Sequence, residues 1–182
     1  LLNQTFSDIN DKLSGTSGIN SSVSRQPLLY NKFAMTSEEY HSQILEITSR
    51  TYYEEYDRYF DELNSILNGC YDQYFQIRAK LLQPVTSSLV EETNATYGGK
   101  SLVKFIQDGK SSYQQLCIDE YNLFMKFFPR EQSHQKINNW LCRLCEPLYD
   151  CVRTKILRET DISMLCDSVT LFRQYYEFEE TS

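Results

Sequence analysis

Residues 140–169 read WLCRLCEPLYDCVRTKILRETDISMLCDSV, and the fold that the sequence predicts depends on this stretch. The opposite sides of the segment differ in character, since charged residues such as Arg143, Glu146 and Asp150 avoid its apolar positions. The apolar residues recur at steps of three or four, which places them on one face of an α-helix: Ile137, Leu141, Leu144, Leu148, Val152 and Ile156. A helix with one apolar face buries that face against other helices, so the stretch predicts an all-α bundle.

The composition fits a single folded domain made largely of helices. Of the 182 residues, 41% are hydrophobic and 24% are charged, which is close to the usage of ordinary globular proteins. Six glycines and four prolines are few for this length, so we expect long helices. Fourteen tyrosines and ten phenylalanines suit surfaces that another protein chain covers.

The net charge and the hydropathy pattern argue against several classes of function. A formal charge of −7 without any run of Lys and Arg disfavours binding to nucleic acid or to anionic lipid. No apolar stretch reaches the roughly 20 residues that a transmembrane helix requires. The first residues, LLNQTFSDIN, lack the basic and apolar regions of a signal peptide, so we expect a soluble fragment that begins inside a longer protein.

The N-terminal part of the chain is expected to divide at residues 13 and 35. Apolar residues at positions 2, 6, 9 and 13 predict the end of a helical or coiled-coil segment over residues 1–13. Residues 14–35 are predicted to form a flexible linker, poor in apolar residues, that ends in a docking patch. The patch consists of Leu28, Leu29, Tyr30 and Phe33. Residues 36–182 are expected to form the helical-bundle domain, an elongated rod of long antiparallel helices without a sheet.

A long helix is expected to begin near Thr36, because Thr36 and Glu39 form a capping-box pattern and no Gly or Pro follows before Gly69. Its apolar residues alternate steps of four and three, which gives a heptad seam about 37 Å long at a rise of 1.5 Å per residue. The seam consists of Tyr56, Phe60, Leu63, Leu67, Cys70, Tyr74, Ile77 and Leu81.

Such a seam packs either inside its own bundle or against a helix of another chain. We place a protein-binding surface at its N-terminal end, over Tyr56, Phe60, Leu63 and Leu67. The aromatic members suit a surface that is shared with another helix. The C-terminal end, from Tyr74 to Leu81, is expected to be covered within the bundle.

The remaining helices are bounded by proline, glycine and capping residues. Pro84 is expected to kink or break the long helix, and Gly98-Gly99 is the clearest turn in the sequence. Ser101 can cap a helix that runs to Pro129, with Gly109 as a point of close packing.

Two further elements complete the expected bundle. Pro147 predicts a kink or a fresh first turn inside the helix that carries the apolar face described first. Thr160 and Asp161 can cap a final helix.

The cysteines offer the only recognisable spacing for site chemistry. Cys142 and Cys145 form a CxxC, but a structural zinc site needs four ligands and no second CxxC is present. We expect all six cysteines to be reduced, with Cys142, Cys145 and Cys166 packed as small hydrophobes. No catalytic, cofactor-binding or metal-binding residue is predicted, so the sequence does not indicate an enzyme.

Three blocks of the sequence carry a resemblance to a known family. They are Cys70-Tyr71 with Arg78, Leu81-Leu82 and Pro84; Leu116-Cys117 with Glu120, Tyr121, Leu123 and Phe127-Phe128; and Leu144-Cys145 with Leu148-Tyr149-Asp150, Arg153, Glu159 and Leu165-Cys166. Taken in this order and spacing, they resemble the third subunit of the conserved oligomeric Golgi complex, a vesicle-tethering assembly of helical-rod subunits.

This resemblance implies a non-catalytic scaffold, bound peripherally to the cytosolic face of the Golgi apparatus, that helps to capture vesicles in retrograde transport between cisternae. The implied partners are sibling subunits of the same complex, together with SNARE proteins, Rab GTPases, coiled-coil tethers and coatomer. No cofactor is implied. The alternative is an unrelated cytosolic helical adaptor with a structural metal site at the CxxC.

Overall fold

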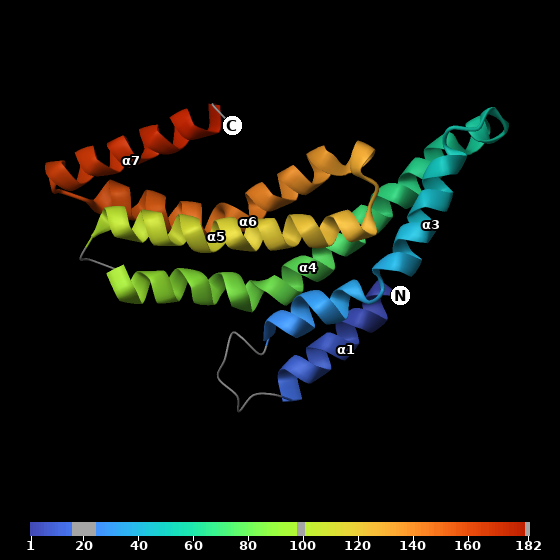
Figure 1. The fold of residues 1–182 in the computed structure, drawn as a ribbon, viewed down its shortest axis with the longest axis horizontal. Coiled ribbons are helices and arrows are strands. Elements are labelled where there is room, and N and C mark those ends of the chain that lie inside the picture. The colour runs from blue at the N-terminus through green and yellow to red at the C-terminus, as the bar shows by residue number, and fades with distance from the viewer. Residues whose placement is uncertain (16–24, 98–100, 181–182) are drawn as a thin grey trace. The chain divides into compact units, whose positions relative to one another are not determined.

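The computed structural model describes residues 1–15, 25–97 and 101–180, with the side chains of 130–132 and 176–180 excepted. This part of the chain is helical and contains no strand, which confirms the all-α class (Figure 1). The elements in chain order are α1 (Leu2–Gly15), a π-helical segment η1 (Pro27–Lys32), α3 (Ser37–Arg50), a 3-10 helix η2 (Glu54–Tyr59), α4 (Phe60–Tyr97), α5 (Leu102–Phe127), α6 (Arg130–Arg158) and α7 (Ile162–Glu180).

The chain divides into two compact units, and each is described here by itself. The first unit comprises Leu1–Gln83 and Ile118–Leu141, and the second comprises Pro84–Cys117 and Cys142–Ser182. Residues 16–24 of the predicted linker and the predicted Gly98-Gly99 turn lie outside the described residues. The domain limits at residues 13 and 35 stay a prediction.

An aromatic cluster forms the core of the first unit. Phe33 is completely buried, and its ring centroid lies 5.9 Å from that of Tyr74 and 5.3 Å from that of Phe127. Tyr71 stacks on Phe128 with a centroid distance of 4.3 Å. Aromatic pairs of this kind contribute beyond the area that they bury. Phe33 of the docking patch is therefore part of this core.

The predicted long helix from Thr36 is wrong, because the chain instead forms two helices, α3 and α4, joined through residues 51–59. Thr36 does not cap α3, and its hydroxyl donates to the carbonyl of Phe33. Tertiary packing explains why the chain turns between α3 and α4. Tyr40 of α3 is buried, and its hydroxyl donates to the carbonyl of Cys70 on α4 at 3.2 Å. A continuous helix would carry Tyr40 away from this core, so burial overrides the absence of Gly and Pro.

Neither internal proline ends a helix. Pro84 lies within α4 and Pro147 lies within α6, so of the alternatives expected there a break at Pro84 and a fresh first turn at Pro147 do not occur, and a kink at either proline stays a prediction. A proline in a helix removes one backbone hydrogen bond and clashes with the preceding turn. Both prolines are exposed, so the carbonyls that lose their amide partner can bond to water.

The second unit consists of the C-terminal part of α4, the N-terminal part of α5, the C-terminal part of α6, and α7. Leu102 and Ile106 of α5 form a core cluster with Leu171 of α7, and Val152 and Ile156 of α6 pack against it. Ser101 caps α5 as predicted, because its hydroxyl accepts a hydrogen bond from the amide of Lys104.

The cap of α7 and the state of the cysteines can also be compared with the sequence predictions. Asp161 caps α7 as predicted, because its Oδ1 accepts hydrogen bonds from the amides of Ser163 and Met164. None of the six cysteines forms a disulfide. Cys142 and Cys166, however, are exposed, so the prediction that they pack as hydrophobes is wrong.

The two helical glycines of α4 and α5 are expected to respond differently to alanine. A Cβ at Gly69 would have no heavy atom within 4 Å, whereas a Cβ at Gly109 would lie 2.7 Å from Cδ1 of Leu148. Gly69→Ala should therefore stabilise the chain by about 1 kcal/mol through helix propensity. Gly109→Ala should lose this gain, because Leu148 has to shift. Urea unfolding measures both, and equal gains would contradict close packing at Gly109.

Candidate protein-binding surface

The hairpin of α3 and α4 in the first unit ends in residues 51–62, which we call the hairpin tip (Figure 1). The helix α3 ends with 3-10-type hydrogen bonds, from the amide of Thr51 to the carbonyl of Thr48 and from Tyr52 to Ser49, both 3.1 Å. Tyr53 is extended, with φ −95° and ψ 125°, and η2 then leads into α4. The local sequence therefore builds a protruding turn from residues that mostly disfavour helix interiors, namely β-branched and aromatic ones.

The hairpin tip exposes aromatic side chains at high density. The exposed fractions are 70% for Tyr52, 58% for Tyr53, 44% for Tyr59 and 49% for Phe60. Single exposed apolar residues are ordinary on a protein surface, but a contiguous group is typical of a site that binds another protein. Tyrosine is enriched in such sites because its large ring and its hydroxyl both contribute to contacts.

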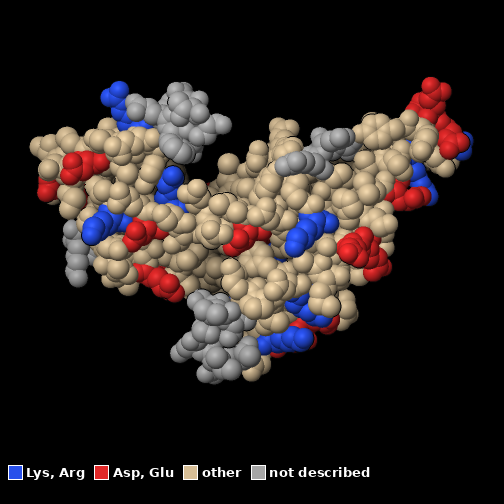
Figure 2. Space-filling model, in the orientation of Figure 1, with Lys and Arg blue, Asp and Glu red and all other residues tan. Residues whose placement is uncertain are grey.

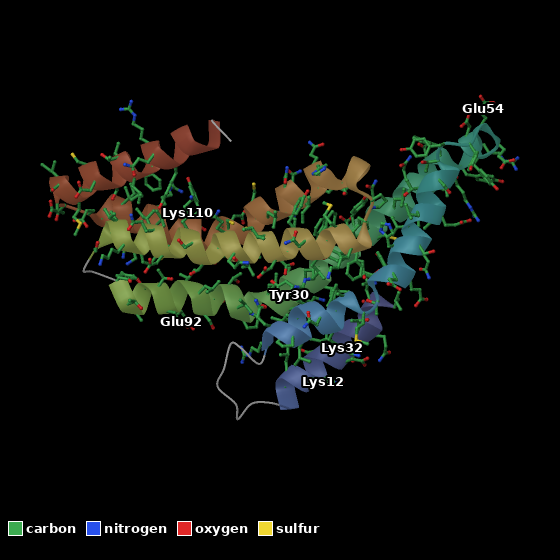
Figure 3. All side chains as sticks on the ribbon, in the orientation of Figure 1. Lys12, Tyr30, Lys32, Glu54, Glu92 and Lys110 are labelled. Carbon is green, nitrogen blue, oxygen red and sulfur yellow. The ribbon has the colours of Figure 1, made fainter. Side chains whose placement is uncertain are left out.

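Carboxylates surround these aromatic side chains. Acidic side chains gather at this end of the molecule in Figure 2, and Figure 3 places Glu54 there. The exposed acidic residues of the tip are Glu54, Glu55, Asp57, Asp61 and Glu62. Arg58 lies over the ring of Tyr59, with Cζ 4.7 Å from the centroid. The exposed aromatic side chains thus form the centre of the tip. Its rim is acidic, because five carboxylates outnumber one guanidinium.

The four residues predicted to bind a partner lie at or next to this tip. Tyr56 is half-buried in η2, beneath Arg50, whose Cζ lies 5.9 Å from the ring centroid. Phe60 is the first residue of α4 and is exposed. Leu63 is half-buried and Leu67 is only 6% exposed. Of the four, Phe60 therefore presents the most side-chain surface to a partner.

The heptad pattern missed Tyr52, Tyr53 and Tyr59. These residues belong to no helical period, because they lie in the turn and the 3-10 helix. A usable signal was present in residues 51–60, TYYEEYDRYF, where aromatic residues are interspersed with charged ones and form no periodic apolar face. Such a segment has little to bury against its own bundle.

Below the hairpin, a buried ion pair joins three segments of the first unit. Nε and Nη2 of Arg78 donate to the two carboxylate oxygens of Glu120 at 3.0 and 2.6 Å, and Nη1 donates to the carbonyl of Leu29 at 2.8 Å. Burial lowers the pKa of Arg78, but the Glu120 carboxylate more than offsets this, and the net pKa is raised. The guanidinium also lies over the ring of Phe33, with Cζ 4.7 Å from the centroid. Arg78 therefore fixes the docking patch against α4 and α5.

Two further observations concern metal sites and membrane-spanning helices. In the described part of the chain, no three His, Cys, Asp or Glu side chains come together as a metal site would require. Of the described helices, none combines the length and the apolar character of a membrane span.

Comparison with known proteins shows which family the chain is similar to. The model of the family "Conserved oligomeric Golgi complex subunit 3, C-terminal" matches residues 26–182. The protein of that name from Saccharomyces cerevisiae is 49% identical over 184 residues, which covers 100% of this chain and 23% of the relative. The Schizosaccharomyces pombe protein of the same name is 26% identical over 115 residues, or 63% of this chain and 15% of the relative. The chain thus spans less than a quarter of either relative, and no solved structure matches it.

Proposed function

Because the chain belongs to the family of conserved oligomeric Golgi complex subunit 3, we propose that it is a scaffold segment that joins its subunit to a sibling subunit through the hairpin tip. The observation that supports this proposal is the group of exposed aromatic side chains at Tyr52, Tyr53, Tyr59 and Phe60. A subunit of a multisubunit complex must bury such a surface against another chain to gain the hydrophobic free energy of association.

The chemistry of the tip defines the sibling surface that fits it. An aromatic centre binds an apolar groove or the apolar face of a helix, and the five carboxylates around it favour Lys and Arg at the edge of that surface. Charged pairs at an interface rim are weakened by salt, since the Debye length falls to about 3 Å at 1 M. The contact that we propose is therefore an apolar anchor with a salt-sensitive basic rim on the partner.

The substitution Phe60→Asp tests this contact in the full-length subunit. It places a charge in the centre of the proposed interface, and loss of a central anchor typically costs about 2 kcal/mol or more, roughly a 30-fold loss of affinity. We expect recovery of sibling subunits with the affinity-purified variant to fall accordingly. The melting temperature should stay close to that of the unmodified protein, because Phe60 is 49% exposed.

A matched control is Tyr149→Asp, which places the same charge at a 65% exposed aromatic residue of α6 in the second unit. This variant should retain the sibling subunits. If Phe60→Asp retains them as well, the hairpin tip is not the contact. If it lowers the melting temperature strongly, the N-terminal end of the seam is internal and the partner surface must lie elsewhere.

The finer parts of the proposal rest on the resemblance to the tethering family. They are the capture of vesicles in retrograde transport, peripheral attachment to the cytosolic face of the Golgi apparatus, and contacts with SNARE proteins, Rab GTPases, coiled-coil tethers or coatomer. These contacts are assigned to no residue of this chain. Fluorescent tagging of the full-length subunit addresses the location, and Phe60→Asp should disperse it from the Golgi if sibling contacts hold it there.

A further inference from the structure

Two thiols lie against each other inside the second unit. The Sγ atoms of Cys117 on α5 and Cys145 on α6 are 3.5 Å apart, and both side chains are half-buried. A disulfide has an S–S length of about 2.05 Å, so the two sulfur atoms need to approach by about 1.5 Å to become bonded. A pair at this distance on two facing helices needs only a small side-chain adjustment.

The packing of α5 against α6 explains why the two thiols are so close. A Cβ at Gly109 would lie 2.7 Å from Cδ1 of Leu148, so the absence of a side chain at Gly109 lets the two helices approach each other. Cys117 lies about two turns along α5 from Gly109, and Cys145 lies about one turn before Leu148 on α6. The two helices are therefore held together on the side that carries both thiols.

The contact also favours the thiolate form of one of the two cysteines. A hydrogen bond from Cys117 lowers the pKa of Cys145 to about 7, although burial of the group acts in the opposite direction. The other titratable groups near the pair are Tyr113 on α5 and Cys151 on α6. Burial raises the pKa of Tyr113 to about 12, and the neighbouring cysteine thiols raise it in the same direction as smaller causes. The tyrosine hydroxyl therefore stays neutral near pH 7. The thiolate is the nucleophilic form of cysteine, so Cys145 is the attacking group of the pair.

We propose that Cys117 and Cys145 are a redox modification site, at which a peroxide converts the two thiols into a reversible disulfide between α5 and α6. The Cys145 thiolate attacks one oxygen of the peroxide, the O–O bond breaks, and a sulfenic acid forms while hydroxide leaves. The sulfur of Cys117 then attacks the Cys145 sulfur, and its proton departs with the hydroxyl group as water. The two thiols lose two electrons and two protons in total, hydrogen peroxide is reduced to two waters, and a small dithiol reverses the reaction.

Peptide mapping of the peroxide-treated full-length subunit identifies the bond. Cleavage after Lys and Arg places Cys117 in residues 111–126, Cys142 in residues 137–143, and Cys145 with Cys151 in residues 144–153. Without a reductant, we expect a cross-linked species of 111–126 with 144–153, lighter than the sum of the two peptides by two hydrogens. A further cut before Asp150 should leave the cross-link on the fragment that contains Cys145.

Variants separate this bond from its competitors. Cys142→Ser and Cys151→Ser should keep the cross-link, whereas Cys117→Ser should abolish it. Oxidation should raise the melting temperature of the unmodified protein and of Cys142→Ser but not of Cys117→Ser, because a bond between the two helices restricts the unfolded chain.

Two results would overturn the inference. A bond within the CxxC, which joins 137–143 to 144–153, would show that Cys142 is the partner of Cys145. Oxidation of exposed Cys142 and Cys166 to higher acids, with Cys117 and Cys145 still reduced, would show that the contact between the helices protects the pair.

Discussion

Replacement of Arg78 by Met is expected to destabilise the chain by about 3–5 kcal/mol, a large part of the roughly 5–15 kcal/mol by which ordinary proteins are stable. Arg78 and Glu120 are both completely buried, so removal of the guanidinium leaves the carboxylate without its partner in the core. The same substitution removes the hydrogen bond to the carbonyl of Leu29 at 2.8 Å and thus the attachment of the docking patch. Thermal and urea unfolding followed by circular dichroism measure the loss.

The paired substitution Arg78→Met with Glu120→Leu provides the control. A buried ion pair that is replaced as a whole by apolar residues often costs little, whereas removal of one partner leaves an uncompensated charge. The double variant should therefore regain most of the stability that Arg78→Met loses. If Arg78→Met alone unfolds like the unmodified protein, water reaches Glu120 and the pair is not the anchor that its geometry indicates.

The ion pair between Arg78 and Glu120 was not predicted from the sequence. Periodicity predicted the all-α class correctly, because burial of one helix face leaves a repeating pattern in the sequence. Arg78 and Glu120 appeared only as matched residues of the resemblance. A long-range pairing has no local pattern, so the sequence could not show that these two residues meet.

The difference between local sequence patterns and long-range contacts also explains the errors at the helix ends. Gly and Pro act on the backbone locally, and on that basis α3 and α4 were expected to be continuous and Pro84 was expected to kink or break the helix. The structure reverses the first expectation, since burial of Tyr40 and Ile44 turns the chain after Arg50, and it excludes a break at Pro84, since α4 continues through this residue. Tertiary packing outweighs local preferences of about 1 kcal/mol and even the larger cost of a helical proline.

The candidate surface was predicted in part. The heptad pattern indicated Phe60 and its neighbours, but it assigned to one continuous seam a segment that is partly a 3-10 helix. The tyrosines at positions 52, 53 and 59 add most to the exposed surface, and their contribution depends on a turn that the pattern did not predict. Sequence spacing likewise paired Cys145 with Cys142 in a CxxC, whereas its close contact is Cys117 on the neighbouring helix.

Replacement of Ile77 by Asp is expected to unfold the first unit, in contrast to Phe60→Asp on the same helix. Ile77 is 4% exposed, and an aspartate there would bury a charge without a partner, which belongs to the small class of substitutions that cost more than about 4 kcal/mol. Circular dichroism should show loss of the cooperative melting transition. Ile77→Val, which keeps the site apolar, should cost only about 1 kcal/mol.

The comparison of Ile77→Asp with Phe60→Asp decides how α4 is divided between folding and binding. If Ile77→Asp unfolds the chain and Phe60→Asp only releases sibling subunits, the residues from Tyr74 to Leu81 build the core while the tip remains for a partner. If Ile77→Asp instead melts normally, the face around Ile77 is open to solvent in solution. The partner surface would then extend along α4 well beyond the hairpin tip, and the apolar length available to a sibling helix would be correspondingly greater.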